Sequence, residues 1–335
     1  MTGWSLLLLG ALCVAWAARG QAKLTYTPRA LTTGRDAQLW LDERHADCAR
    51  DKVWSVASER LVRHGDKTPR TFLYIHGFGA CRAEGEGVVD IVANNTSSNT
   101  LYLRLPGHGT DAEDHASRGA QEYLDCVTEG LEVAQTLGEQ VIVIGTSMGG
   151  LLATWLAATY PDDVDALILA APYYAHRNRY LHTLLNARWG LPLMHRLRGP
   201  IRETGGYPER GQPGYDERWL VRQRYAALPE LERLRRYIAR PDVFRGVTAP
   251  TLTLVHDDGL GGRDRTSSIA AIHAALSLMP GVQHHAASRH VAIADGAHVL
   301  LSDYVRTDKV TIHHAIERFL DELPQARHGG PHVPS

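Results

Sequence analysis

Short apolar runs and longer apolar stripes alternate along most of this chain. Six runs of four to seven residues are typical of buried strands and lie at residues 71–76, 100–105, 140–144, 164–170, 251–255 and 291–294. Longer stretches place apolar residues at helical spacing and predict helices at residues 119–137, 149–160, 267–279 and 307–323. This alternation predicts an α/β fold, in which helices cover both faces of a mostly parallel, doubly wound sheet.

The alternation stops between residues 173 and 247. Gly and Pro interrupt this segment around two helical patterns, at residues 217–227 and 229–239, which predicts a helical insertion. The insertion holds 15 Arg, no Lys and seven acidic residues, a formal charge of +8, so the remaining residues carry −9 for a total of −1. This asymmetry indicates either that the insertion faces an anionic surface or that it is a solvated helical face. The core domain is therefore expected in two parts, residues 21–172 and 248–323.

The two ends of the chain differ in composition from the domain between them. No charged residue occurs at residues 2–18, and an apolar centre leads to a run of small residues. Residues 1–20 are therefore expected to be a secretory signal peptide, which predicts a secreted or periplasmic protein. The segment is short for a membrane span, but no Lys or Arg lies near Met1, so retention as a membrane anchor is the alternative. The tail at residues 324–335 is expected to be disordered.

Composition narrows the classes of function. With 44% hydrophobic and 22% charged residues, the 335-residue chain has a globular composition, and its net charge of −1 lacks the basic excess of nucleic-acid-binding proteins. Beyond the signal peptide remain Cys48, Cys81 and Cys126, an odd number that predicts one disulfide, of open pairing, and one free thiol. No Cys-x-x-Cys or tightly spaced Cys/His group occurs, so nothing in the sequence indicates a zinc site.

Residues 145–149, Gly-Thr-Ser-Met-Gly, carry the strongest chemical signal. They form a G-x-S-x-G motif between a predicted strand and a predicted helix rich in Ala and Leu. A tight strand-to-helix turn holds its serine in a strained conformation, and glycines two positions to either side avoid clashes with the neighbouring backbone. Ser147 is therefore the candidate nucleophile.

A serine nucleophile needs a base that takes its proton and a carboxylate that holds this base in the right tautomer. His298 follows the last predicted strand, where a loop brings an imidazole over the carboxyl edge of the sheet, whereas His284, His285 and His290 precede that strand. His298 is therefore the candidate base.

The candidate acid lies after the predicted strand at residues 251–255. Asp257, Asp258 and Asp264 all follow this strand. Asp264 is favoured because it lies before Arg265-Thr266 and the helix predicted from about residue 267, and Asp258 is the alternative acid. Asp257 and Asp258 are otherwise expected to form hydrogen bonds that cap the glycine-rich loop at residues 259–262.

An oxyanion hole needs two backbone N–H donors that point at the developing negative charge. Met148 follows the candidate nucleophile at the positive end of a helix and is expected to supply one donor. Phe78, between Gly77 and Gly79 in the loop after the first predicted strand, is expected to supply the other. His76 is expected to orient this loop rather than to act as a base.

Taken together, these motifs resemble the α/β-hydrolases, and within them the monoacylglycerol lipase and carboxylesterase group, bacterial secreted members included. The similarity covers about residues 70–323, through the segments YIHGFGA, LRLPGHGTDAED, GTSMGG, GGRDRT and GAHVLL. It implies a Ser147, Asp264 and His298 triad, an oxyanion hole from Phe78 and Met148, no cofactor, and a lid between the sixth and seventh strands. The acid loop departs from the group, because DDGLGG lengthens the path from the strand to Asp264.

These observations predict a serine ester hydrolase that cleaves acyl esters through a covalent acyl-enzyme. The expected partners are small-molecule or lipid esters and an anionic membrane surface at the Arg-rich insertion, without nucleic acid. The alternatives are another chemistry on the same scaffold, such as carbon–carbon bond hydrolysis or cofactor-free peroxidation, and a non-catalytic binding protein. Acyl length, alcohol part and oligomeric state stay open.

Overall fold

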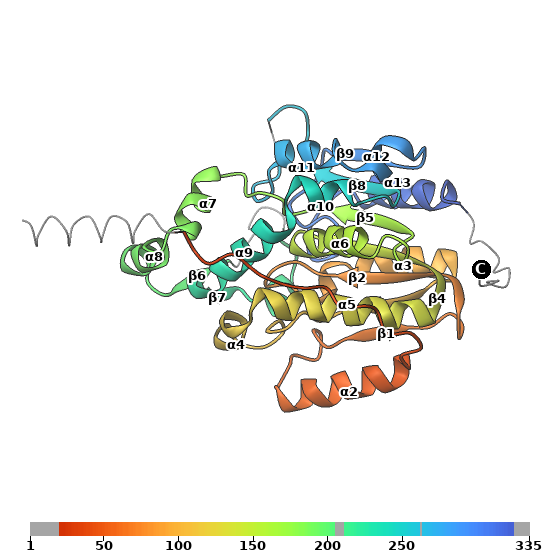
Figure 1. The fold of residues 1–335 in the computed structure, drawn as a ribbon, viewed down its shortest axis with the longest axis horizontal. Helices are drawn as coiled ribbons and strands as arrows, with labels where there is room; N and C mark the ends of the chain where they lie inside the picture. Colours follow the sequence, from red (N-terminus) through yellow and green to blue (C-terminus); the bar gives the residue numbers. More distant parts are fainter. Residues whose placement is uncertain (1–19, 205–210, 262, 325–335) are drawn as a thin grey trace, which may run out of the picture.

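The computed structural model describes residues 20–204, 211–261 and 263–324. Its centre is a seven-stranded sheet of order β1-β3-β2-β4-β5-β8-β9 (Figure 1). Only β1 runs antiparallel to its neighbour; the other strands of this sheet pair in parallel. The mostly parallel sheet predicted from the sequence is confirmed. The strands are β1 (Arg60–Val62), β2 (Thr68–Ile75), β3 (Asn99–Tyr102), β4 (Gly138–Thr146), β5 (Ala166–Ala170), β8 (Thr251–His256) and β9 (Arg289–Ile293).

Helices cover both faces of the sheet, so its central strands are buried on both sides. In β2, Phe72 and Tyr74 pack into one apolar cluster with α3 and α13, while Leu73 and Ile75 pack into the opposite cluster with α5 and α6. The core helices are α2 (Ala37–Arg50), α3 (Glu86–Thr96), α4 (Ala112–Ser117), α5 (Ala120–Leu137), α6 (Met148–Thr159), α11 (Ile269–Leu276), α12 (Pro280–His284) and α13 (Lys309–Asp321).

The Arg-rich insertion joins β5 to β8, which are adjacent in the sheet. It therefore follows the fifth strand of this sheet, not a sixth as the resemblance implies. Its elements are α7 (Arg179–Asn186), α8 (Gly190–Arg198), β6 (Ile201–Glu203), β7 (Arg222–Arg224), α9 (Leu228–Ile238) and α10 (Pro241–Arg245). In Figure 1, α7, α8 and the β6–β7 ribbon lie beyond the sheet at the end far from the C-terminus.

One helical prediction inside the insertion is wrong. Residues 217–227 form β7 between two short 3-10 turns, because Arg222–Arg224 pair with β6 and alternate in burial, with Gln223 buried between two arginines that are more exposed. The other prediction is confirmed by α9, whose apolar residues pack on the core. Pairing with a neighbouring strand thus overrides a weak helical pattern.

The first described residues contact both the insertion and the core. The Gln21 N–H donates to the Asn186 carbonyl of α7 at 2.8 Å, and the Tyr26 hydroxyl donates to Asp125 of α5 at 2.6 Å. The Tyr237 hydroxyl of α9 donates to the Tyr26 carbonyl at 3.1 Å. Most of the predicted signal peptide, residues 1–19, and residues 325–335 of the predicted tail lie outside the described residues. Within the described ranges, no helix is long and apolar enough to cross a membrane.

The predicted disulfide is wrong in this structure. Cys48, Cys81 and Cys126 are all free and buried. Their thiols make separate hydrogen bonds, to the Glu59 carboxylate at 3.2 Å, the Arg218 carbonyl at 3.2 Å and the Arg104 carbonyl at 3.5 Å, respectively. Burial raises the pKa of Cys48 to about 11 and the pKa of Cys81 and of Cys126 to about 12, so all three are neutral thiols near pH 7.

Candidate active site

Ser147 occupies the sharp turn between β4 and α6. Its backbone has φ 53° and ψ −112°, a conformation that is strained for any residue with a side chain. A Cβ atom at Gly149 would lie 1.9 Å from the Ile75 carbonyl oxygen, and one at Gly145 would lie 2.4 Å from the Gly149 carbonyl oxygen. Both flanking positions therefore require glycine, as the motif predicts.

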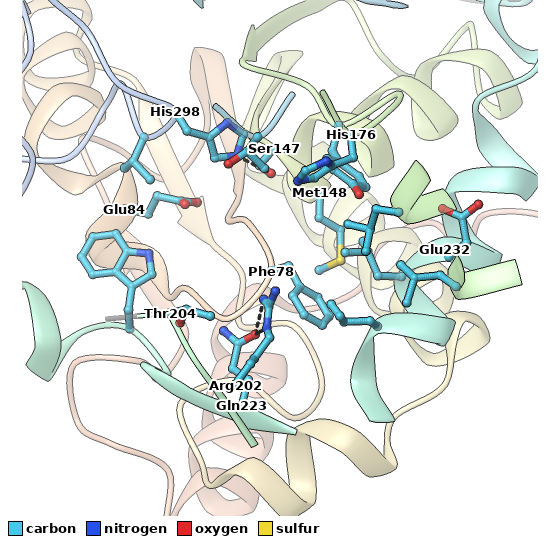
Figure 2. Close-up of a pocket in the computed structure, with 18 of the residues that line it drawn as sticks. Phe78, Glu84, Ser147, Met148, His176, Arg202, Thr204, Gln223, Glu232 and His298 are labelled. Carbon is cyan, nitrogen blue, oxygen red and sulfur yellow. Dashed lines mark hydrogen bonds between the residues drawn. The ribbon is translucent and has the colours of Figure 1, made fainter. Parts of the chain in front are cut away.

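A chain of hydrogen bonds connects Ser147, His298 and Asp264. The Ser147 hydroxyl lies 2.8 Å from His298 Nε2, and His298 Nδ1 lies 2.8 Å from Asp264 Oδ2. The other oxygen of Asp264 accepts the backbone N–H groups of Thr266 at 2.7 Å and Ser267 at 2.8 Å. The structure thus brings together the three residues expected from the sequence, which come from three different loops (Figure 2 shows Ser147 and His298).

Burial and charge shift the pKa values of His298 and Asp264 in opposite directions. Burial alone would lower the pKa of His298, but the charge and hydrogen bond of Asp264, with a smaller contribution from Glu84, raise it above its ordinary value. Burial alone would raise the pKa of Asp264, but His298 and the N–H groups of Thr266 and Ser267 lower it. Asp264 is therefore a carboxylate, and it accepts a hydrogen bond from the Nδ1–H of His298.

Asp257 and Asp258 lie outside the hydrogen-bond chain of Ser147, His298 and Asp264, and they stabilise the loop after β8. Asp257 accepts the Gly259 N–H at 2.9 Å and pairs with Arg263, and Asp258 accepts the Leu260 N–H at 2.8 Å. The loop closes on itself, so that the Asp264 N–H donates to the carbonyl of His256, the last residue of β8, at 3.0 Å. The longer acid loop therefore returns Asp264 to the strand end.

The two expected oxyanion donors are available. Among the described residues, neither the Phe78 N–H nor the Met148 N–H donates to another protein group, and both residues line the same cavity as Ser147. His76, which is fully buried, donates from Nδ1 to the Gly77 carbonyl at 2.9 Å and accepts the Leu105 N–H at Nε2, 3.1 Å away. Burial lowers the pKa of His76 well below its ordinary value, so the ring is neutral and holds the loop, as expected.

The cavity above Ser147 has a volume of about 240 Å³. Core residues form its floor, and the insertion supplies the rest of its wall (Figure 2). The insertion contributes both apolar and polar side chains: Tyr173, His176, Leu181, Leu185, Arg202, Thr204, Tyr215, Trp219, Gln223, Leu228, Leu231 and Glu232. A ligand at Ser147 would therefore contact the insertion as well as the core.

Residues 72–328 match the model of the alpha/beta hydrolase family, which is most of the chain. The chain belongs to the alpha/beta hydrolase family. Its seven-stranded sheet, with Ser147 at the turn after β4, is the arrangement that this family uses to expose a nucleophile.

This alpha/beta hydrolase is similar to lipases and esterases over part of its length. It is 29% identical over 125 residues to a (Lyso)-N-acylphosphatidylethanolamine lipase of Bos taurus, which is 37% of this chain and 35% of that protein. It is 28% identical over 118 residues to the monoacylglycerol lipase ABHD6 of Homo sapiens, 34% of each chain. The matched regions thus span about a third of these curated relatives.

Solved structures of lipolytic enzymes share the fold. A structure described under LipS and LipT, two metagenome-derived lipolytic enzymes, superimposes with a TM-score of 0.65 at 15% sequence identity. The match covers 81% of this chain and 99% of that one. At this level of identity, the likeness concerns the fold alone.

Sequence reasoning missed one titratable residue of this hydrolase's cavity floor, Glu84. It lies in a 3-10 turn, Arg82–Glu84, its side chain is 2% exposed, and it lines the cavity with Ser147 and His298. No periodic pattern in the sequence distinguishes Glu84 from its neighbours. The nearby Glu86 is the same residue type, but it pairs with Arg60 and Arg82. Only the tertiary contacts separate these two glutamates.

Proposed function

We propose that this alpha/beta hydrolase is a serine ester hydrolase of the carboxylesterase or monoacylglycerol lipase type. The observation that carries the proposal is the continuous hydrogen-bond chain from Ser147 through His298 to Asp264, at 2.8 Å for each step. Neutral His298 Nε2 accepts the Ser147 proton as the Ser147 oxygen attacks the ester carbonyl. Asp264 keeps the Nδ1 tautomer and stabilises the imidazolium that forms.

The remaining steps use the same groups. The N–H groups of Phe78 and Met148, which have no other protein acceptor among the described residues, bind the oxygen that becomes negative. His298 then returns its proton to the departing alcohol, which leaves an acyl group on Ser147. A water molecule, deprotonated by His298, attacks this acyl group and releases the carboxylic acid.

The cavity and the relatives support an acyl ester as the substrate. A volume of about 240 Å³ lies below the usual range for drug-sized ligands, so only the part of a substrate nearest the ester fits inside. The curated relatives include proteins named lipases and esterases, which favours an acyl ester over the other chemistries of this fold.

The surface of α7 and α8 supports contact with an anionic membrane. Residues 177–200 hold five arginines and no acidic residue or lysine, a formal charge of +5. Among the described residues, none of these five arginines has an ion-pair partner, whereas several arginines farther along the insertion pair with acids, as Arg235 does with Glu232. Four large apolar side chains are exposed between them: Tyr180, Trp189, Leu193 and Leu197. Exposed apolar and cationic side chains together favour an anionic lipid surface.

The start of the described chain lies at the same surface. Gly20 pairs with Ala187, between α7 and α8, so the first described residue lies beside the exposed side chains of this surface. We propose that residues 1–20 direct the protein to export as a signal peptide. If this segment is retained as an anchor, its point of attachment would turn the α7–α8 surface toward the bilayer.

A series of p-nitrophenyl esters of increasing acyl length tests the proposal. We expect turnover by the wild-type protein and a loss of about 10⁴-fold or more in Ser147→Ala, because that change removes covalent catalysis and little packing. Absence of turnover with every ester would favour carbon–carbon hydrolysis, peroxidation or a non-catalytic role. Ser147→Ala activity within tenfold of wild type would exclude Ser147 as the nucleophile.

A further inference from the structure

Glu84 connects the two loops that carry the expected oxyanion donors. Its Oε2 accepts the Gly77 N–H at 2.5 Å, directly before Phe78 in the chain. The same oxygen accepts the Tyr74 hydroxyl at 3.4 Å, and this hydroxyl lies 3.1 Å from the hydroxyl of Thr146, directly before Ser147. Glu84 and Tyr74 thus bridge the Phe78 loop to the nucleophile turn beneath the cavity.

The contact with Gly77 leaves the Phe78 N–H, and not the Gly77 N–H, to face an oxyanion. Because the Gly77 N–H is already bonded to Glu84, it does not serve an oxyanion, and the peptide that follows presents the Phe78 N–H instead. The space there is tight, since a Cβ at Gly77 would lie 3.0 Å from Glu84 Oε1 and 3.3 Å from Ser147 Cβ. Glu84 therefore lies against the backbone that aims the donor, very near the nucleophile.

Few charged groups face Glu84. Among the described residues, His298 is the cationic group whose charge lowers the pKa of Glu84; Tyr74 packs on it from β2, and Arg82, on its own turn, is turned away to Glu86 and the Ser58 carbonyl. Burial raises the pKa of Glu84 to about 7, although the Gly77 N–H and the charge of His298 oppose the rise. The charge of Glu84 in turn raises the pKa of His298. The protonation of each group therefore depends on the charge of the other. Figure 2 shows Glu84 and His298 at the same cavity.

We propose that Glu84 is a positioning residue that fixes the Phe78 loop through the Gly77 N–H and places a second negative charge beside His298. The charge stabilises the imidazolium that forms when Ser147 attacks, and it supplements Asp264 rather than replacing it. This inference rests on the proposed function, because it assumes that Ser147 and His298 react.

Two substitutions separate the two roles of Glu84. Glu84→Gln keeps an oxygen that accepts the Gly77 N–H but removes the charge, whereas Glu84→Asp keeps the charge but withdraws it by one methylene from Gly77. Glu86→Gln is the matched control, since it removes a neighbouring charge that pairs with Arg60 and Arg82. Thermal unfolding first identifies the variants that fold; each folded variant tests its own part of the proposal.

The measurement is the rate at which a fluorophosphonate probe labels Ser147, as a function of pH. We expect Glu84→Gln to move the midpoint of the acid limb to lower pH, and Glu86→Gln to leave it at the wild-type value. We expect Glu84→Asp to keep a midpoint near wild type but to lower the plateau rate by tenfold or more, on the order of what small displacements of catalytic groups cost.

The possible results are distinct. A Glu84→Gln midpoint equal to that of wild type would overturn the electrostatic role, because a glutamate with only a structural role leaves the midpoint unchanged. A Glu84→Asp plateau equal to that of wild type would overturn the positioning role. Failure of the wild-type protein itself to label at Ser147 would contradict the proposed function, and so is distinguishable from failure of the inference about Glu84.

Discussion

Three candidate acids follow β8, and their contacts differ in kind. Asp264 is 1% exposed and bonds to His298, whereas Asp257 and Asp258 bond to the N–H groups of their own loop. We expect Asp264→Asn to lower kcat by about 10⁴-fold, because an amide no longer holds His298 in the correct tautomer. We expect Asp258→Asn to lower it less than tenfold.

Steady-state kinetics of the two purified variants on one p-nitrophenyl ester checks this prediction. A larger loss in Asp258→Asn than in Asp264→Asn would mean that Asp258 is the acid, and that the loop rearranges when substrate binds.

The pH dependence of kcat/KM reports the base. Asp264 raises the pKa of His298 above the ordinary value of 6.5, and only neutral His298 accepts a proton. Activity is therefore expected to fall as the pH drops through this raised pKa and to hold at mildly alkaline pH. Removing the Asp264 charge is expected to move the residual limb to lower pH. A profile that is flat from pH 5 to pH 8 would contradict a histidine base.

Motif residues were predictable from the sequence because their chemistry depends on chain order. Ser147, His298 and Asp264 each follow a predicted strand, and parallel strands bring their carboxyl ends to one edge of a sheet. Glu84 and the three cysteines were not predictable, because their roles depend on which atoms surround them. The structure buries each of these side chains among partners that are distant in the sequence or unmarked by any motif.

The contact between α6 and β2 requires glycine at position 149. An added Cβ there would lie 1.9 Å from the Ile75 carbonyl oxygen, and backbone cannot yield as a flexible side chain can. We expect Gly149→Ala to destabilise the protein by about 1–3 kcal/mol or more and to displace Ser147. Gly65→Ala is the control, because its nearest contact would be an ordinary 3.6 Å.

Thermal unfolding and ester turnover check this prediction together. We expect Gly149→Ala to lose both stability and activity, and Gly65→Ala to keep both. Wild-type stability in Gly149→Ala would show that the turn between β4 and α6 is looser than its geometry indicates.

Helices with a strong apolar periodicity were predicted well, whereas short strands that depend on pairing with a neighbouring strand were not. The stripe at residues 119–137 corresponds to α5 (Ala120–Leu137), whose apolar face is buried on the sheet. The short strands β1, β6 and β7 have three residues each, too few for a pattern to be recognised. They exist because neighbouring strands supply their hydrogen bonds.

The charge asymmetry of the molecule is concentrated around α7 and α8, where residues 177–200 hold five arginines and no acidic residue. We expect Ser147→Ala protein, which cannot consume lipid, to bind anionic vesicles more tightly than zwitterionic ones at 0.1 M salt. The difference is expected to shrink at 1 M salt, because the Debye length falls from about 10 Å to about 3 Å. Replacing Arg188, Arg196 and Arg198 by Ala is expected to weaken anionic binding roughly a hundredfold, at about 1 kcal/mol for each arginine.

A triple replacement of ion-paired arginines is the control for this surface. Arg222, Arg224 and Arg240 pair with Glu203, Glu113 and Asp242, so their removal changes net charge equally but leaves the α7–α8 surface intact. Vesicle co-sedimentation measures both triple variants. Equal binding to both vesicle types at low salt would contradict the membrane proposal and leave the hydrolase proposal untouched.

The proposed function depends on a covalent intermediate in which Ser147 carries the acyl group of the ester. Its most direct test is the mass of the peptide that contains Ser147, after the enzyme is mixed with a p-nitrophenyl ester and quenched in acid within the first turnovers. We predict that this peptide gains the mass of the acyl group in the wild-type protein and gains nothing in Ser147→Ala. Ester turnover without any acyl group on Ser147, or with the acyl group on another residue, would contradict the account.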